Sequence, residues 1–390
     1  MEETGYAGFR QKLNGIVNSW RYIKIKIAVT GEAGAGKSTF INSIRGLKAD
    51  DPFAAKVGST ETTMKPTMYP FPNRPNLELW DLPGFGTLTF DEREKYVKHV
   101  GFEDFDFILL LSAKRFTSND AWLAGEILKV QPAHHLYFVR TQVDYDVQGY
   151  RLSTRTVPTK SDVKVYLQKI QKDCSDLLKT RGIKKCKIFL INSYDCGAYD
   201  YNKLVCKLIE KTDVLKKEAM ILSLHGITND VIKNKLEVLQ GRISTVSKAA
   251  GVEAAYTNRE DRRYPIEVEI MLEEANVYRE QLGLNLEALE VVARKLKVDM
   301  EQMLLKMNMT SYRYSGREED FARFYREYDK FRPGFRHYFP GIGGYLRSKS
   351  YQYQCAITLK AFLDLCAQDV RSLQTYIMLT TDGGDNCLRN

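Results

Sequence analysis

The chain has 390 residues, of which 44% are hydrophobic and 27% are charged, and its net charge is +9. This length allows two domains with hydrophobic cores, and this composition excludes wholesale disorder. The basic excess fits either a solvated surface or a partner such as anionic lipid or nucleic acid, and we favour the solvated surface.

The sequence favours a cytoplasmic protein. Its seven cysteines are scattered without a C-x-x-C pair, an odd count that is typical of reduced thiols. The first ten residues, MEETGYAGFR, lack the pattern of a signal peptide, and Glu2 stands where N-myristoylation needs a glycine. No apolar stretch is long enough to span a bilayer. Any membrane attachment is therefore expected to be peripheral.

The first half of the chain alternates predicted strands and helices. Residues 23–30 predict a strand entering a core, and a glycine loop then leads into a helix. The later elements are a strand at 77–82, a buried strand at 104–113, a helix at 118–130 with Ser118 as its N-cap, a strand at 134–141, an amphipathic helix at 161–180 and a buried strand at 186–193. This order is typical of an α/β fold with a mostly parallel sheet and helices on both faces.

The second half of the chain shows no such alternation. Apolar residues instead recur three and four positions apart, which predicts amphipathic helices. One stripe consists of Leu286, Leu289, Val292, Leu296, Met300, Met303 and Met307, and another of Cys355, Leu359, Phe362, Cys366, Val370 and Leu373. We therefore divide the chain into a short N-terminal helical segment at 1–22, an α/β domain at 23–214 and a helical domain at 215–390.

A phosphate-binding loop follows the first predicted strand. Residues 31–38, GEAGAGKS, fit G-x-x-x-x-G-K-[ST] between a strand and a helix, a context that disfavours a chance glycine turn. Glycines let successive backbone N–H groups point at one phosphate, Lys37 can reach the β- and γ-phosphates, and the Ser38 hydroxyl can bind Mg²⁺. The predicted nucleotide contacts here are Gly34, Ala35, Gly36, Lys37, Ser38 and Thr39.

Two further segments complete a predicted triphosphate and metal site. Asp81-Leu-Pro-Gly84 ends the strand at 77–82, so Asp81 is expected to hold Mg²⁺ through water and the Gly84 N–H to contact the γ-phosphate. A switch loop needs a hydroxyl that binds Mg²⁺ only when the γ-phosphate is present. In GSTETTM, Thr62 and Thr63 are candidates and we choose Thr63, the alternative being a solvated threonine-rich loop.

The segment RTQVDYD predicts a guanine-reading loop. Guanine has two donors on one edge, and a fixed carboxylate such as Asp144 accepts both in a charge-assisted pair. Thr141 would brace this loop, while Gln142, in place of a longer lysine, would cover the base less well. Asn192 and Ser193 would close the other side. A simple capped turn is the alternative for Thr141-x-x-Asp144.

In order, GEAGAGKS, GSTETTM, WDLPGFGT, YFVRTQVD and IFLINS resemble the motifs of the interferon-inducible immunity-related GTPases. VYREQLGLNLEALEVVARKLKVDMEQM and YQYQCAITLKAFLDLCAQDVRSL resemble parts of that family's helical domain. The resemblance implies a Ras-like G domain, a P-loop NTPase fold, joined to an all-helical C-terminal domain. It also implies that the protein binds GTP, GDP and Mg²⁺, hydrolyses GTP, and associates with itself or with related GTPases through the G domain.

The resemblance further implies a cellular location and a set of catalytic residues. It implies interferon-induced, cell-autonomous immunity at endomembranes such as the ER, the Golgi or a pathogen vacuole. Lys37 assigns the chain to the type with a P-loop lysine, and the family's catalytic glutamates fall on Glu32 and Glu61, which would act with Thr63. Phe85 stands where small GTPases carry a water-positioning glutamine. A surface role on the outer side of the P-loop is the alternative for Glu32.

Three departures from the family leave alternatives open. Gln142 replaces the usual lysine, the segment before the first strand is short, and residues 251–272 are polar where relatives often carry apolar, membrane-directed sequence. A non-enzymatic GTP-binding scaffold that regulates related GTPases and, less favoured, an ATP-using P-loop protein are therefore retained beside an active GTPase. Residues 312–338 mix basic and aromatic side chains, but no nucleic-acid module is recognised and no nucleic-acid partner is expected.

Overall fold

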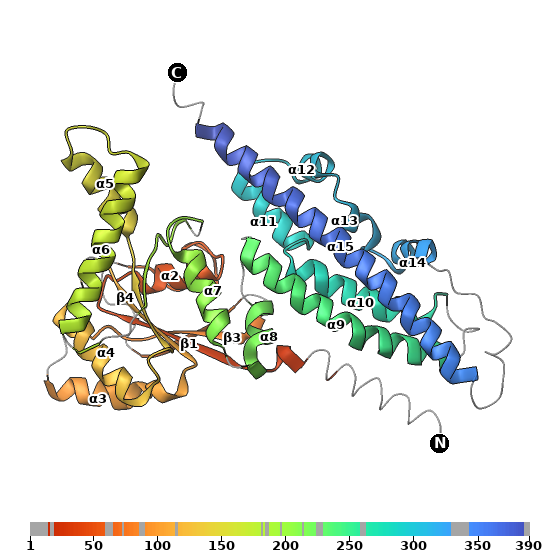
Figure 1. The fold of residues 1–390 in the computed structure, drawn as a ribbon, viewed down its shortest axis with the longest axis horizontal. Helices are drawn as coiled ribbons and strands as arrows, with labels where there is room; N and C mark the ends of the chain where they lie inside the picture. Colours follow the sequence, from red (N-terminus) through yellow and green to blue (C-terminus); the bar gives the residue numbers. More distant parts are fainter. Residues whose placement is uncertain are drawn as a thin grey trace. The chain divides into compact units, whose positions relative to one another are not determined.

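The computed structural model describes residues 15, 19–58, 65–71, 74–85, 90–113, 116–180, 182–183, 187–195, 197–212, 214–223, 229–257, 263–328 and 343–385. The chain divides into two compact units, one running from Trp20 to Thr228 and the other containing the chain from Asn229 onward (Figure 1). The sequence-based boundary after residue 214 lies earlier, and it remains a prediction.

A six-stranded sheet forms the centre of the first unit, with the order β2-β3-β1-β4-β5-β6. The strands are β1 (Ile25–Gly31), β2 (Thr67–Phe71), β3 (Arg74–Asp81), β4 (Phe107–Ser112), β5 (Leu136–Arg140) and β6 (Lys187–Leu190). All neighbours are parallel except β2, which runs antiparallel to β3. The predicted α/β fold is therefore confirmed. β2 was not predicted, because it is a short strand at the sheet edge that contains Pro70.

Helices cover both faces of this sheet, as Figure 1 shows. They are α2 (Lys37–Ile44), α3 (Phe90–Val100), α4 (Ser118–Val130), α5 (Val143–Ser153), α6 (Lys160–Thr180), α7 (Tyr201–Lys211) and α8 (Val214–Ser223), with 3₁₀ turns η1 (Ser19–Arg21) and η2 (Phe102–Asp104). α8 packs against β1 and β3, which is why it belongs to the sheet unit. Of the N-terminal segment predicted at 1–22, residues 1–14 and 16–18 lie outside the described part.

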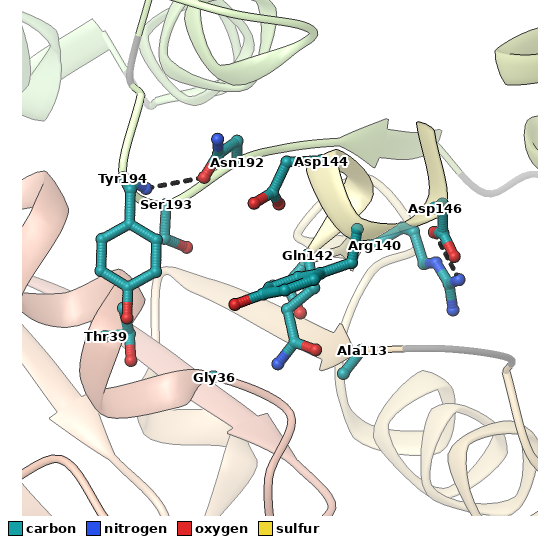
Figure 2. Close-up of a pocket in the computed structure, with 12 residues that line it drawn as sticks. Gly36, Thr39, Ala113, Arg140, Gln142, Asp144, Asp146, Asn192, Ser193 and Tyr194 are labelled. Atoms are coloured by element: carbon teal, nitrogen blue, oxygen red, sulfur yellow. Dashed lines mark hydrogen bonds and ion pairs between the residues drawn. The ribbon is translucent and has the colours of Figure 1, made fainter. Parts of the chain in front are cut away.

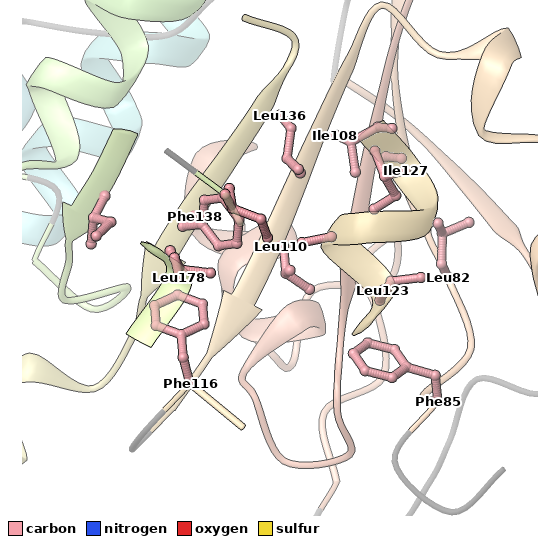
Figure 3. Close-up of a cluster of buried hydrophobic side chains, with 14 of the residues drawn as sticks. Leu82, Phe85, Ile108, Leu110, Phe116, Leu123, Ile127, Leu136, Phe138 and Leu178 are labelled. Atoms are coloured by element: carbon pink, nitrogen blue, oxygen red, sulfur yellow. The ribbon is translucent and has the colours of Figure 1, made fainter. Parts of the chain in front are cut away.

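One hydrophobic core lies between the sheet and helices α3, α4 and α6. Figure 3 shows leucine, isoleucine and phenylalanine side chains of β4 and β5 meeting Leu123 and Ile127 of α4. All six residues of β4 are buried, because side chains alternate between two covered faces. On the face covered by α2 and α7, the rings of Phe40 and Tyr201 lie 6.3 Å apart. The sheet is thus a fixed platform whose strand ends carry the polar loops.

The predicted N-cap of α4 was wrong by one residue. Thr117, not Ser118, is the N-cap, and its Oγ1 accepts a hydrogen bond from the Asp120 backbone N–H at 3.2 Å. The Asp120 carboxylate in turn accepts from the Thr117 backbone N–H at 2.8 Å. This reciprocal capping box needs an acidic or amide side chain three residues after the cap, a spacing that Thr117 satisfies.

The second unit consists of helices α9 (Asn229–Tyr256), α10 (Ile266–Gln281), α11 (Leu286–Leu296), α12 (Met300–Met307), α13 (Thr310–Tyr314), α14 (Glu318–Tyr328) and α15 (Gly343–Asp385). α9 and α15 pack along each other, and the stripe from Cys355 to Leu373 is buried on α15. The other stripe spans two helices, because Lys297 takes a left-handed conformation (φ 54°) between α11 and α12. Within the ranges given above, no helix is long and apolar enough to cross a membrane.

Candidate functional site

The predicted phosphate-binding loop joins β1 to α2. Gly34 and Gly36 have φ values of 78° and 82°, which side chains with a Cβ rarely adopt, so the loop depends on glycine there. α2 begins at Lys37, and free N–H groups at a helix start attract an anion. The Lys37 ammonium donates to the carbonyls of Gly31 (2.9 Å) and Glu32 (3.1 Å), so it lies over the loop.

Two of the predicted metal ligands are adjacent. The Ser38 hydroxyl donates to Oδ2 of Asp81 at 3.0 Å, although 43 residues separate them. They meet because β1 and β3 are parallel neighbours, with Val29 paired to Asp81. Asp81 is 1% exposed, and a carboxylate with a hydroxyl is an oxygen pair of the kind that Mg²⁺ prefers. The third predicted ligand, Thr63, lies outside the described residues.

A cavity of about 600 Å³ opens beside this loop. Its walls come from the phosphate loop and the start of α2, the end of β4, the end of β5 with the first turn of α5, and the loop after β6, as Figure 2 shows. The lining residues are Gly36, Thr39, Ala113, Arg140, Thr141, Gln142, Asp144, Tyr145, Asp146, Asn192, Ser193 and Tyr194. The structure thus brings together Thr39, Thr141, Gln142, Asp144, Asn192 and Ser193, all of which the sequence had selected.

Thr141 and Asp144 line this cavity in different ways. The Thr141 hydroxyl is buried and donates to the Ala35 carbonyl at 2.8 Å, so it ties the loop after β5 to the phosphate loop. Asp144 lies in the first turn of α5, where the helix dipole favours a negative charge. Its carboxylate faces the cavity (Figure 2). An acceptor held in this way can pair with the two donors of a guanine edge.

Gln142 has a contact that the sequence did not suggest. Its backbone is left-handed (φ 58°, ψ 31°) at the start of α5, and its Nε2 donates to the Gly34 carbonyl at 3.3 Å. The amide therefore spans from the predicted base loop to the phosphate loop. Gln142 has two methylenes, whereas lysine has four to lay over a base.

We expect Gln142→Lys to bind GTP about two- to fivefold more tightly, because the longer stem covers more apolar surface of the base. The guanine preference should stay, since Asp144 is unchanged. Equilibrium binding of a fluorescent GTP analogue, with ATP as competitor, measures both quantities. Gln168→Lys, on the exposed side of α6, adds the same charge away from the cavity and is the control. Equal GTP affinity of Gln142→Lys and the unmodified protein would contradict the expectation.

Several cavity residues were missed by the sequence analysis. Tyr145 and Tyr194 line the cavity and are 64% and 79% exposed as residues, and Tyr194 donates its backbone N–H to Asn192 Oδ1 at 2.9 Å. Aromatic residues next to the segments predicted to bind the base were the available signal in the sequence. The Arg140 guanidinium donates to Asp146 at 2.7 Å, and this ion pair ties the start of α5 to β5.

Of the two proposed catalytic glutamates, Glu32 lies within the described part of the chain. Oε1 of Glu32 accepts hydrogen bonds from Thr117 Oγ1 (3.1 Å) and Asn119 Nδ2 (3.0 Å), so its carboxylate is held by the residues at the start of α4. Burial, reinforced by the nearby charge of Glu32, raises the pKa of the Asp120 carboxyl to about 6. Glu61 lies outside the described residues.

Phe85 cannot take the part of a water-positioning glutamine. The side chain is fully buried in the core between the sheet and α3, where its ring lies 6.3 Å from that of Tyr96. A hydrocarbon ring has neither donor nor acceptor for water. If the site hydrolyses a triphosphate, another group must orient the water.

Comparisons with known proteins agree with these features. A family model described as interferon-inducible GTPase (IIGP) matches residues 6–377. T-cell-specific guanine nucleotide triphosphate-binding protein 2 of Mus musculus is 32% identical over 90% of this chain and 81% of its own length. Interferon-inducible GTPase 1 of Mus musculus is 30% identical over 94% of this chain and 83% of its own. Among solved structures, the match to Era of Aquifex aeolicus covers 61% of this chain and 69% of that chain at 15% identity, with a TM-score of 0.34.

Proposed function

Because this chain belongs to the interferon-inducible GTPase family, whose members hydrolyse GTP, we propose that it binds GTP with Mg²⁺ and converts it to GDP. The observation that carries the proposal is the cavity in which Asp144 lies beside the phosphate loop. A nucleoside triphosphate needs this combination of a base-reading acceptor and a helix start with converging N–H groups.

The phosphates would lie against the loop from Gly34 to Thr39. There the Lys37 ammonium would exchange its two carbonyl partners for phosphate oxygens. Ser38 and Asp81 would hold Mg²⁺, with Thr63 as the ligand that depends on the γ-phosphate. When bound, Mg²⁺ supplies positive charge against the charge that develops on the phosphates.

For hydrolysis we propose that Glu32 and Glu61 orient the attacking water, since Phe85 cannot. The hydrogen bonds from Thr117 and Asn119 support a defined place for the Glu32 carboxylate. Held by two donors, this carboxylate cannot swing freely, which reduces the entropy lost in reaching a productive geometry.

We further propose that the protein associates with itself or with related GTPases through its G domain, with boundaries near residues 23 and 214. The names of the relatives support a role in interferon-induced immunity. A cytoplasmic chain with peripheral attachment to endomembranes remains our proposal for its location.

GTP turnover per molecule is expected to rise with protein concentration if association orders the catalytic groups. Phosphate release from purified protein across a range of concentrations measures this, with Lys37→Ala as the blank. A flat rate near that of the blank would reject the active GTPase.

The same assay separates the second candidate function, a GTP-binding scaffold, which Gln142 and its contact to Gly34 favour. A scaffold would bind GTP but turn it over only when a related GTPase is added. Strong turnover by the protein alone would exclude it.

Competition between ATP and a labelled GTP analogue tests the third candidate, an ATP-using protein. That candidate predicts that ATP displaces the labelled analogue as well as GTP does.

A further inference from the structure

The hydroxyl of Tyr96 lies between the phosphate loop and the turn after Asp81. The proposed function assigns both segments to the binding of the phosphates. Tyr96 is on α3 and is 9% exposed. Its Oη is 3.2 Å from Oγ1 of Thr30, which directly precedes Gly31, the first residue of the phosphate loop. It also donates to the carbonyl of Pro83 at 3.1 Å, and Pro83 directly precedes Gly84. One side chain therefore contacts the start of both loops.

The direction of these hydrogen bonds follows from their donors. The Pro83 carbonyl can only accept, so Tyr96 gives its single hydrogen to that carbonyl. The hydrogen between Tyr96 and Thr30 must then come from the Thr30 hydroxyl. A chain of two bonds thus runs from the end of β1, through α3, to the turn after Asp81.

The surroundings keep this hydroxyl in place. The centroid of the Tyr96 ring lies 6.3 Å from that of Phe85 and 6.3 Å from that of Phe102. The three rings belong to the core between the sheet and the helices. Thr30 is fully buried. Burial also raises the pKa of the Tyr96 hydroxyl above its ordinary value, so the group keeps its proton and is a donor at neutral pH.

We propose that Tyr96 positions the Gly84 amide for the γ-phosphate and couples α3 to that turn, so that the affinity for GTP relative to that for GDP depends on the tyrosine hydroxyl. This role rests on the proposed function, because it assumes that Gly84 contacts the γ-phosphate. GDP has no γ-phosphate, so loosening the turn weakens only the binding of GTP. Tyr96 is a positioning residue, since it reaches the nucleotide only through the turn.

Tyr96→Phe tests the proposal, since it removes the hydroxyl and keeps the ring. The affinity for a non-hydrolysable GTP analogue should fall about five- to tenfold, the equivalent of one net hydrogen bond, while GDP affinity changes less than about twofold. Calorimetric titration of both nucleotides with Mg²⁺ gives the ratio. A ratio that stays constant, whether both affinities fall together or neither changes, would overturn the role of Tyr96.

Tyr137→Phe is the matched control. Tyr137 lies on β5 of the same sheet and is 1% exposed, and within the described part of the chain its hydroxyl has no hydrogen-bond partner. Removing it should leave the GTP-to-GDP ratio unchanged. A shift as large as that of Tyr96→Phe would mean that any buried tyrosine hydroxyl affects the ratio, which would also overturn the proposal.

A second measurement uses the unmodified protein and does not depend on the variant folding. Amide hydrogen exchange in α3 should be slower with the GTP analogue than with GDP, because the fixed turn holds Tyr96 and its helix. Identical exchange in the two states would contradict the coupling. If the unmodified protein bound neither nucleotide, the proposed function itself would fail; if it bound both and the ratio did not respond to Tyr96→Phe, only the present inference would fail.

Discussion

Replacing Asp144 with asparagine is expected to lower GTP affinity by about a hundredfold or more. Two hydrogen bonds from guanine to a carboxylate are lost, and bonds to a charged group contribute about 1.5–3 kcal/mol each. Binding of xanthosine triphosphate should improve, because xanthine has an acceptor oxygen at C2 that the asparagine amide can meet with its NH₂ group. Titration with both triphosphates measures the exchange of preference.

Rescue by the xanthine nucleotide separates a change in base reading from a damaged fold. The phosphate loop, with Lys37 and Ser38, is untouched, so triphosphate binding as such should persist. Asp176→Asn, which removes a half-exposed carboxylate on α6, is the matched control and should alter neither affinity. If Asp144→Asn bound GTP as tightly as the unmodified protein, Asp144 would not read the base.

Gly251→Ala is expected to destabilise the helical unit by about 3 kcal/mol, the upper part of the range for an overpacked core. Gly251 lies on α9 and faces Gln352 of α15. A Cβ there would stand 2.5 Å from the backbone nitrogen of Gln352 and 2.8 Å from its Cα. Backbone atoms cannot rotate away as a side chain can, so the two helices would have to separate. Urea unfolding followed by circular dichroism gives the change.

Gly241→Ala supplies the comparison on the same helix. No atom lies within 4 Å of the position that its Cβ would take. Alanine forms helix more readily than glycine, so this variant should gain about 0.5–1 kcal/mol. Changes of the same sign in the two variants would contradict the close crossing of α9 and α15 at Gly251.

Most of the sheet unit could be predicted from sequence because its strands are covered on both faces. β4 and β5 appear as near-continuous apolar runs, and the glycine loop marks where β1 ends and α2 begins. Helix α5 was not predicted. It begins at Val143, inside the loop predicted to read the base, and its N-cap Gln142 has a left-handed backbone conformation that no periodic pattern encodes. The single stripe from Leu286 to Met307 likewise concealed the break at Lys297.

Some residues of the candidate site could be predicted from the sequence, whereas the contacts between them could not. Short motifs have fixed spacing, so Lys37, Ser38, Asp81 and Asp144 could be selected from the order of segments alone. Contacts between distant segments have no such signal. The bonds from Thr117 and Asn119 to Glu32 join residues 85 and 87 positions apart.

By itself the sequence determined which groups are candidates for the chemistry of this protein: a glycine loop predicted to bind phosphates, a carboxylate predicted to hold the metal and a carboxylate predicted to read the base. Each of these needs particular residue types at short, fixed distances along the chain. Only the tertiary structure decided which side chains hold those groups in place: the Gln142 amide on Gly34, the residues before α4 on Glu32, and the Tyr96 hydroxyl between Thr30 and Pro83. These contacts form because parallel strands bring their loops to one edge of the sheet, an arrangement set by packing of the whole unit and not by local spacing.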